Sequence, residues 1–305
     1  MPAGAEGSAL ASVIQFFTGN AIVALMLAAG LQTTNSVLAD LSRRWKLASK
    51  ALAVVWIAIP SIAILVVRLL HVPRAGTAAL LVMAICAGVP LVVKTSRRAH
   101  GAADTTLMVL LATALTAPIM IPVWSAILTR VTPIALHASP TEVLGVLVPT
   151  VVIPFLIGRI IQRISQRAAG VLARVANVMF IVGLALLLAV LIYRGVPILS
   201  QTTLRAVIAV VIVTLAAAGL GYLAGRPRAS DQISLAYAAA LGNPALALVI
   251  AAHGVPGARA APMIAAYVVV RTLALLPFGI WLAWRSRRRS TPLSHDPDLA
   301  PAHGH

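Results

Sequence analysis

Long apolar runs recur along nearly the whole chain, and they constrain the fold more than any other feature of the sequence. Several of them reach the roughly 20 residues that an α-helix needs to cross about 30 Å of hydrocarbon. Membrane strands would instead alternate apolar and polar residues over segments of about ten. With 60% hydrophobic and 10% charged residues, a soluble fold would leave large apolar patches in water. The sequence therefore predicts an all-α polytopic membrane protein.

The apolar runs divide residues 1–284 into about nine transmembrane helices of a single domain. The tail, residues 285–305, is basic at first and then rich in Pro, His and Asp, which predicts a disordered cytoplasmic extension. The expected spans cover residues 9–31, 47–70, 76–97, 104–129, 143–165, 171–193, 203–225, 232–253 and 260–284.

The distribution of Lys and Arg sets the expected orientation. Of the 24 basic residues, 17 fall in one alternate set of connections and 6 in the other, and Arg271 alone lies deep in an expected span. Because cytoplasmic connections carry the excess of positive charge, we expect the N-terminus outside the cytoplasmic membrane and the C-terminus inside. The same scatter argues against nucleic acid as a partner despite the net charge of +17, since such binding gathers basic residues on one soluble face.

The seven acidic residues fall outside the expected spans or at their rims, so no embedded carboxylate is available for a proton relay or a metal. The histidines also map to loops, span ends and the tail, which argues against a buried Ser–His pair and against an enzyme. One cysteine excludes a multi-cysteine metal site. Asp104 and Asp231 stand where spans begin, and we expect them to cap free backbone N–H groups there.

Two helix-breaking triplets are the strongest candidates for a site. Gly88 to Pro90 lies near the middle of one expected span, and Gly242 to Pro244 lies near the middle of another. Proline removes a backbone donor, and glycine lowers the cost of unwinding. Helices broken at matching positions of two halves are typical of secondary transporters, where half-helix N-termini attract anions and free carbonyls attract cations. Ordinary proline kinks are the alternative interpretation, because this chain has prolines in other spans as well.

Three side chains lie close enough to these triplets, or deep enough in a span, to take part. Arg271 would cost at least about 2.5 kcal/mol at the bilayer centre if it faced lipid, so it should face the protein interior, for substrate binding or for pairing with backbone carbonyls. Lys94 follows the first break by about one turn, and reaches either the cavity or the cytoplasmic surface. Cys86 either lines the same cavity or packs as a small apolar group.

Several short motifs resemble those of the bile acid:sodium symporter family, within the wider group that includes arsenite permeases and auxin-type carriers. Cys86 to Gly88, Ala99 to Gly101 and Pro118 agree in spacing with the family's Cys-Pro-Gly-Gly segment, its Ala-Lys/Arg-Gly turn and a later Pro. The stretch Gly242 to Ala247 resembles the family's Gln-Asn-Ser-Gly-Leu-Ala. The resemblance covers roughly residues 12–284 and implies inverted repeats, interleaved core and panel subdomains, and two discontinuous helices that cross in the core.

The same alignment shows which of the family's sodium ligands this chain lacks. Val, Leu and Ala side chains supply no oxygen donors for a hard cation, so no metal or other cofactor is expected and sodium coupling is in doubt. The positions that align with the family's ligands are Val92, Val93, Thr106, Leu110, Ala238 and Gly242.

Together these features predict a secondary transporter that moves a small organic anion across the lipid bilayer by alternating access. The candidate substrate-binding residues are Arg271, Asn243, Lys94, Cys86 and Thr106. One alternative is a sodium-dependent symporter of bile acids or organic anions that uses Thr106 and backbone carbonyls. Another is an arsenite or metabolite exporter that uses Cys86, and a third is a receptor or assembly subunit that transports nothing.

Overall fold

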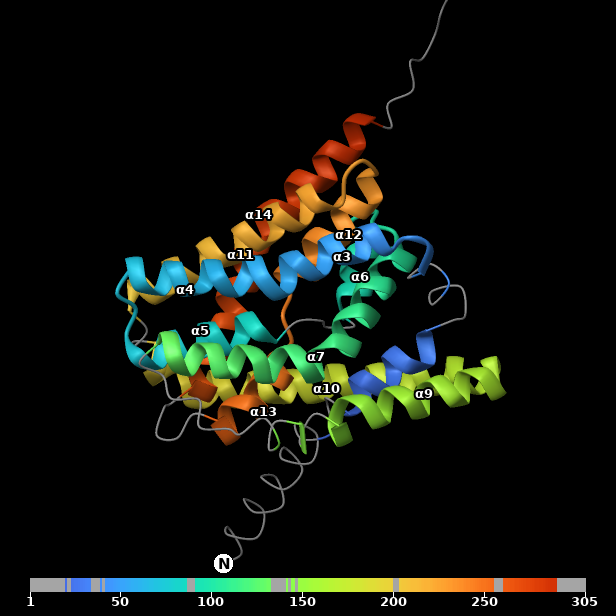
Figure 1. Cartoon of the computed structure of the whole chain (residues 1–305), viewed down its shortest axis with the longest axis horizontal. Coiled ribbons are helices and arrows are strands. Elements are labelled where there is room, and N and C mark those ends of the chain that lie inside the picture. The colour runs from blue at the N-terminus through green and yellow to red at the C-terminus, as the bar shows by residue number, and fades with distance from the viewer. Residues whose placement is uncertain are drawn as a thin grey trace, which may run out of the picture.

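The computed structural model describes residues 20, 23–33, 39, 42–86, 91–132, 141, 144–145, 148–199, 203–254 and 260–289 (Figure 1). All elements in these ranges are helices. Three stretches are long and apolar enough to cross a membrane, namely Trp45–Leu69, Ala103–Val131 and Leu204–Ala224. Shorter apolar helices cover Val23–Gln32, Arg74–Ile85 and Ala266–Leu282. The described part is thus all-helical, as the sequence predicts.

Two of the expected spans consist of two helices each, and the total of about nine spans stays a prediction. The spans expected at 76–97 and 232–253 are the pairs α5–α6 and α12–α13. The first expected span, residues 9–31, lies mostly outside the described residues. In chain order the elements are α3 (Trp45–Ala53), η1 (Val54–Ala58), α4 (Ile59–Leu69), α5 (Arg74–Ile85), α6 (Leu91–Arg98), α7 (Ala103–Val131), η2 (Val148–Val152), α9 (Ile153–Ile164), α10 (Gln166–Leu199), α11 (Leu204–Ala224), α12 (Ala229–Ala240), α13 (Pro244–Gly254) and α14 (Ala260–Arg289).

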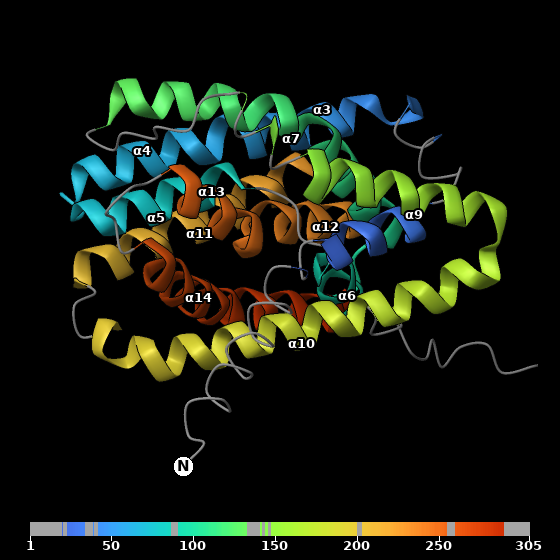
Figure 2. The same cartoon turned by 90° about the horizontal axis from the view of Figure 1, so that it is seen from below.

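Most buried apolar side chains form one cluster, to which α3, α4, α5, α7, α11, α12 and α14 all contribute. Two smaller clusters, built mainly from alanines, join the helix Val23–Gln32 to α10. Figures 1 and 2 show α10 on the far side of the molecule from α3 and α4. The helix Val23–Gln32 also packs closely on α9, because a Cβ on Gly158 would lie only 2.4 Å from the carbonyl oxygen of Leu27.

The long helix from Trp45 to Leu69 is interrupted by η1, a π-helical segment that ends just before Pro60. In a regular α-helix, residue 60 would donate its N–H to the carbonyl of Trp56, and proline has no N–H to give. The indole Nε1 of Trp124, on α7, donates to this carbonyl at 2.5 Å. The indole of Trp56 in turn donates to Thr116 Oγ1, also on α7, at 2.9 Å. Two tryptophans therefore join the helices where the proline disturbs one of them.

The expectation that Asp104 and Asp231 cap helix N-termini is wrong. α7 begins at Ala103 and α12 at Ala229, so both carboxylates lie inside the first turn, and neither helix has a side-chain cap at its start. Asp231 is buried and forms a salt bridge with Arg44. It also accepts a hydrogen bond of 2.6 Å from the hydroxyl of Thr105. A tertiary partner brought from the start of α3 satisfies this carboxylate instead of the local backbone.

Replacing Trp124 by Phe should lower Tm, because the change removes a donor from the Trp56 carbonyl in a setting with little water. We expect a loss of about 1 kcal/mol or more in the free energy of unfolding. Unfolding can be followed with a thiol-reactive dye, because the one cysteine of the chain, Cys86, is fully buried. Trp45→Phe is the control, since Trp45 is 61% exposed. Equal Tm values for the two variants would contradict this account.

Candidate functional site

The two interrupted helices meet at their interruptions. The backbone N–H of Asn243, between α12 and α13, donates to the carbonyl of Cys86 at 2.7 Å, just after α5 ends. Gly242 and Pro244 lie in this region as the sequence predicts, whereas Gly88 and Pro90 fall outside the described residues. The chain therefore brings a segment near residue 86 into direct backbone contact with a segment near residue 243.

Gly242 is required at this crossing because the other backbone approaches too closely for a side chain. A Cβ at this position would lie 2.7 Å from the carbonyl oxygen of Cys86 and 3.0 Å from that of Met83. It would also lie 2.9 Å from the Nη1 atom of Arg271. Two of these three neighbours are backbone atoms, which cannot turn away as a flexible side chain can.

Arg271 lies on α14 with its side chain at the crossing, and the residue is only 9% exposed. Its Nη1 donates to the carbonyl of Ala240, the last residue of α12, at 3.3 Å. Its Nη2 lies 3.5 Å from the sulfur of Met83, near the end of α5. The side chain faces the protein interior, as expected, and its hydrogen-bond partner is a backbone carbonyl, one of the two arrangements that the sequence left open.

Asn243 is completely buried and directly precedes α13, with its side chain folded back on the helix. Its Oδ1 accepts a hydrogen bond from the backbone N–H of Leu246 at 3.1 Å, as in an N-cap. Its Nδ2 has no hydrogen-bond acceptor among the described residues. A buried amide donor without an acceptor costs free energy, so this group is suited to a ligand that accepts a hydrogen bond.

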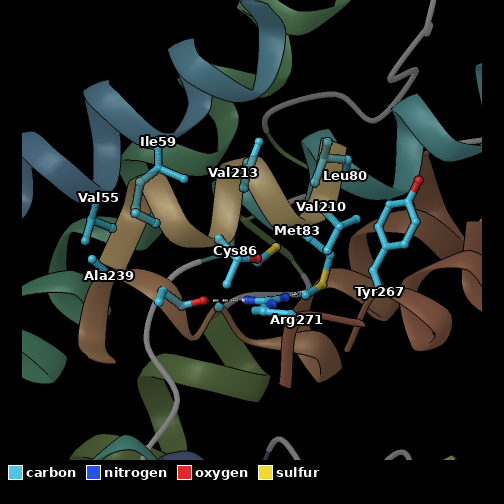
Figure 3. A pocket seen from close by; sticks show the side chains of 15 residues that line it. Val55, Ile59, Leu80, Met83, Cys86, Val210, Val213, Ala239, Tyr267 and Arg271 are labelled. Atoms are coloured by element: carbon cyan, nitrogen blue, oxygen red, sulfur yellow. Dashed lines mark hydrogen bonds between the residues drawn. The ribbon is translucent and has the colours of Figure 1, made fainter. Parts of the chain in front are cut away.

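A small cavity lies beside the crossing (Figure 3). Side chains from η1, α4, α5, α11, α12 and α14 line it, and most of them are apolar. Cys86, Met83, Tyr267 and Arg271 are among them, and the dashed lines in Figure 3 mark the two contacts of the guanidinium. The hydroxyl of Tyr267 is already bonded to the carbonyl of Gly76 at 2.9 Å. The guanidinium is thus the charged group of a largely apolar space.

The model of the sodium bile acid symporter family matches residues 20–218, well over half of the chain. This chain belongs to that family. As a symporter-family protein with several apolar helices, it is a multi-pass membrane transporter. No curated protein matches the chain. The matched region contains α5 to α7 and ends within α11, so α12, α13 and α14, which supply Asn243 and Arg271, lie beyond it.

This chain has buried apolar side chains at the positions that the motif spacings predict to match the family's sodium ligands. Val92, Leu110 and Ala238 are 2%, 6% and 9% exposed, respectively. Thr106 keeps an oxygen, but its hydroxyl bonds Ser96 Oγ and the carbonyl of Ala102, each at 3.0 Å. Thr106 is not among the residues that line the cavity. Among the described residues, no three His, Cys, Asp or Glu side chains gather as a metal site.

The structure therefore brings together three of the five candidate residues, namely Arg271, Asn243 and Cys86. Thr106 lies apart, in a group of hydroxyls completed by Ser96 and Ser234, whose Oγ atoms are 3.2 Å apart. The side chain of Lys94 lies outside the described part.

The sequence did not predict the bonded set of Arg44, Thr105 and Asp231. Arg44 and Asp231 are 187 positions apart, so no local pattern could have paired them. Arg226 and Arg228 lie much closer to Asp231 in the sequence than Arg44 does, so nothing in the sequence pointed to the distant partner.

Replacing Gly242 by Ala should disrupt the crossing, because the added methyl group meets two backbone carbonyls. We expect a destabilisation of about 1–3 kcal/mol, the usual cost of overpacking. The matched control is Gly219→Ala on α11, where an added Cβ has no neighbour within 4 Å. That change should leave Tm unchanged or raise it slightly, since alanine favours a helix over glycine. Thermal unfolding of the two purified variants decides the matter, and similar Tm values would contradict the tight crossing.

Proposed function

We propose that this chain is a secondary transporter of a small organic anion, and that it works by alternating access without sodium. The proposal rests on membership of a transporter family and on the groups at the start of α13. One observation carries the choice of an anion, namely the completely buried Nδ2 donor of Asn243, which lacks an acceptor in the described part.

The dipole of α13 favours a carboxylate beside Asn243. α13 begins at Pro244, so the positive end of its dipole lies next to the amide of Asn243. Pro244 has no N–H and the N–H of Leu246 is bonded to Asn243 Oδ1, so Nδ2 of Asn243 is the side-chain donor offered to an anionic oxygen here. Arg271 is bonded to Ala240 on the other side of Gly242, so the proposed anion site depends on Asn243 and α13 and not on a direct contact with Arg271.

The proposed mechanism divides the chain into a core that carries the crossing and a panel against which it moves. Helices α3 to α7 and α11 to α14 would form the core, and Val23–Gln32, α9 and α10 the panel. The alanine clusters that join Val23–Gln32 to α10 give the panel contacts of its own, while Leu25, Phe155 and Phe180 pack it against the main cluster. The proposed orientation, with the N-terminus outside and the C-terminus in the cytoplasm, rests on the distribution of Lys and Arg.

The apolar residues at the positions predicted to match the family's sodium ligands argue for transport without sodium. A sodium-coupled symporter needs several oxygen ligands, and Val92, Leu110 and Ala238 have none in their side chains. The hydroxyl of Thr106 is bonded within the protein. A sodium-dependent symporter would therefore have to use backbone carbonyls at the crossing.

Replacing Asn243 by Asp should weaken anion binding at least about tenfold, since a carboxylate oxygen replaces the N–H donor and a like charge repels the ligand. Asp keeps the N-cap acceptor for Leu246, so α13 should remain capped. Binding can be measured with straight-chain monocarboxylates from acetate to hexanoate as the probes, followed by uptake into proteoliposomes. Asn243→Ser, which also keeps a cap but adds no charge, should lose less. Failure of every carboxylate to bind the unmodified protein would contradict the proposed substrate class.

Sodium should have no specific effect on this protein. A specific ion that binds only the folded state raises Tm by mass action, and we expect equal Tm values in sodium and in potassium chloride. Uptake into proteoliposomes should likewise be the same with an inward sodium gradient and with choline in its place. A Tm that rises in sodium alone, or uptake that requires the gradient, would restore the sodium-coupled alternative.

A further inference from the structure

Arg271 lies where the carboxyl ends of two half-helices, α5 and α12, come together. We propose that its guanidinium is the resident cation of the crossing, a positioning residue that holds these two helix ends and does not bind substrate. A cation site thus exists at the crossing, and a side chain of the protein itself occupies it. This inference does not depend on the substrate class proposed above.

The contacts of the guanidinium reach both helix ends. Nη1 donates to the carbonyl of Ala240, the last residue of α12, and Nη2 contacts the side chain of Met83 in the last turn of α5. A single added atom on Gly242 would lie within 3.0 Å of both Nη1 and the Met83 carbonyl, so the guanidinium and the end of α5 flank the same glycine. The planar group therefore lies between the terminal carbonyl of α12 and the Met83 side chain at the end of α5, beside the space that Gly242 leaves open.

The positive charge of Arg271 at the crossing can be balanced without an acidic side chain. The carboxyl end of a helix carries the equivalent of roughly half a negative elementary charge, so two such ends together offset about one positive charge. None of the side chains that line the cavity is a carboxylate. The carboxylate of Asp231 is bonded to Arg44 and Thr105 at the opposite end of α12. Two helix ends and one guanidinium thus neutralise each other, and the arginine does not need a substrate anion as its counter-ion.

The size and shape of arginine suit this position better than other cations of the chain would. A guanidinium presents five donors in one plane, so it can face two groups of carbonyls at the same time. A lysine ammonium would be a single point of charge on a flexible stem. The apolar lining of the cavity, which includes Val55, Ile59 and Val213, leaves few competing hydrogen-bond partners.

The test is chemical rescue of Arg271→Ala by a free cation in the absence of substrate. Removing the guanidinium should lower Tm by about 5 °C or more, a shift well within reach of a lost buried contact in a protein of this size. Methylguanidinium at millimolar concentration should then restore at least half of that loss, because a ligand of the folded state raises its stability. The unmodified protein should show no such gain, since its own side chain fills the site. Calorimetry is the suitable readout, because the emptied site adjoins Cys86.

Further variants test whether the charge or the volume of the Arg271 side chain stabilises the protein. Arg271→Met fills the space without charge, and it should be as unstable as Arg271→Ala and should not respond to methylguanidinium. The Tm of Arg271→Lys should lie between that of Arg271→Met and that of the unmodified protein. If the alanine variant does not fold, the comparison of the methionine and lysine variants tests the proposal. Thr272→Ala is the control, since Thr272 is exposed and its hydroxyl bonds only its own helix, at Val268. A methionine variant as stable as the unmodified protein would overturn the proposal, as would an alanine variant that no cation stabilises.

Discussion

The fold of this transporter depends on how helix ends are satisfied inside a membrane, where little water is available to bond free backbone groups. The hydrogen bond from Asn243 to the Cys86 carbonyl is the central case, because it joins two interrupted helices at their interruptions. Each interruption exposes carbonyls on one side and N–H groups on the other. The crossing therefore has a side that attracts cations, at the ends of α5 and α12, and a side that attracts anions, at the start of α13. Arg271 occupies the first side, and the amide of Asn243 marks the second.

Arginines perform the same task at other helix ends of this chain. Arg68 donates to the carbonyl of Val131, the last residue of α7, at 2.5 Å. Arg159 donates to the carbonyl of Thr33, just after the helix Val23–Gln32 ends, at 2.9 Å. In each case a cation lies at the negative end of a helix dipole, and the long side chain comes from a different helix. Part of the large positive charge of the protein thus has a structural use at helix ends.

Polar side chains at the far end of α12 form a second organised region. Asp231 is held by Arg44 and Thr105, and nearby the hydroxyls of Ser96 and Ser234 lie 3.2 Å apart. These groups tie the start of α3, the helices α6 and α7, and the start of α12 to each other, and they satisfy one another within the protein. The crossing is therefore supported from one side by a bonded polar network and from the other by apolar packing around the cavity. Substrate movement in the proposed mechanism leaves this unit intact and changes its contacts with α9 and α10.

Much of this architecture follows from local sequence. The apolar runs determined the helices because no other backbone arrangement satisfies its own hydrogen bonds in lipid, and Gly242 with Pro244 determined where α12 stops and α13 starts. The depth of Arg271 in an apolar run also predicted that it faces the interior. Tertiary structure alone decided its partners, since Ala240 and Met83 become its neighbours only when α14 packs against both half-helices. The same holds for Asp231, whose position at a helix start suggested a local cap but whose charge is balanced by Arg44, because a buried carboxylate gains more from a cation than from exposed backbone groups. Contacts between distant segments depend on how whole helices pack, and no short stretch of sequence contains that information.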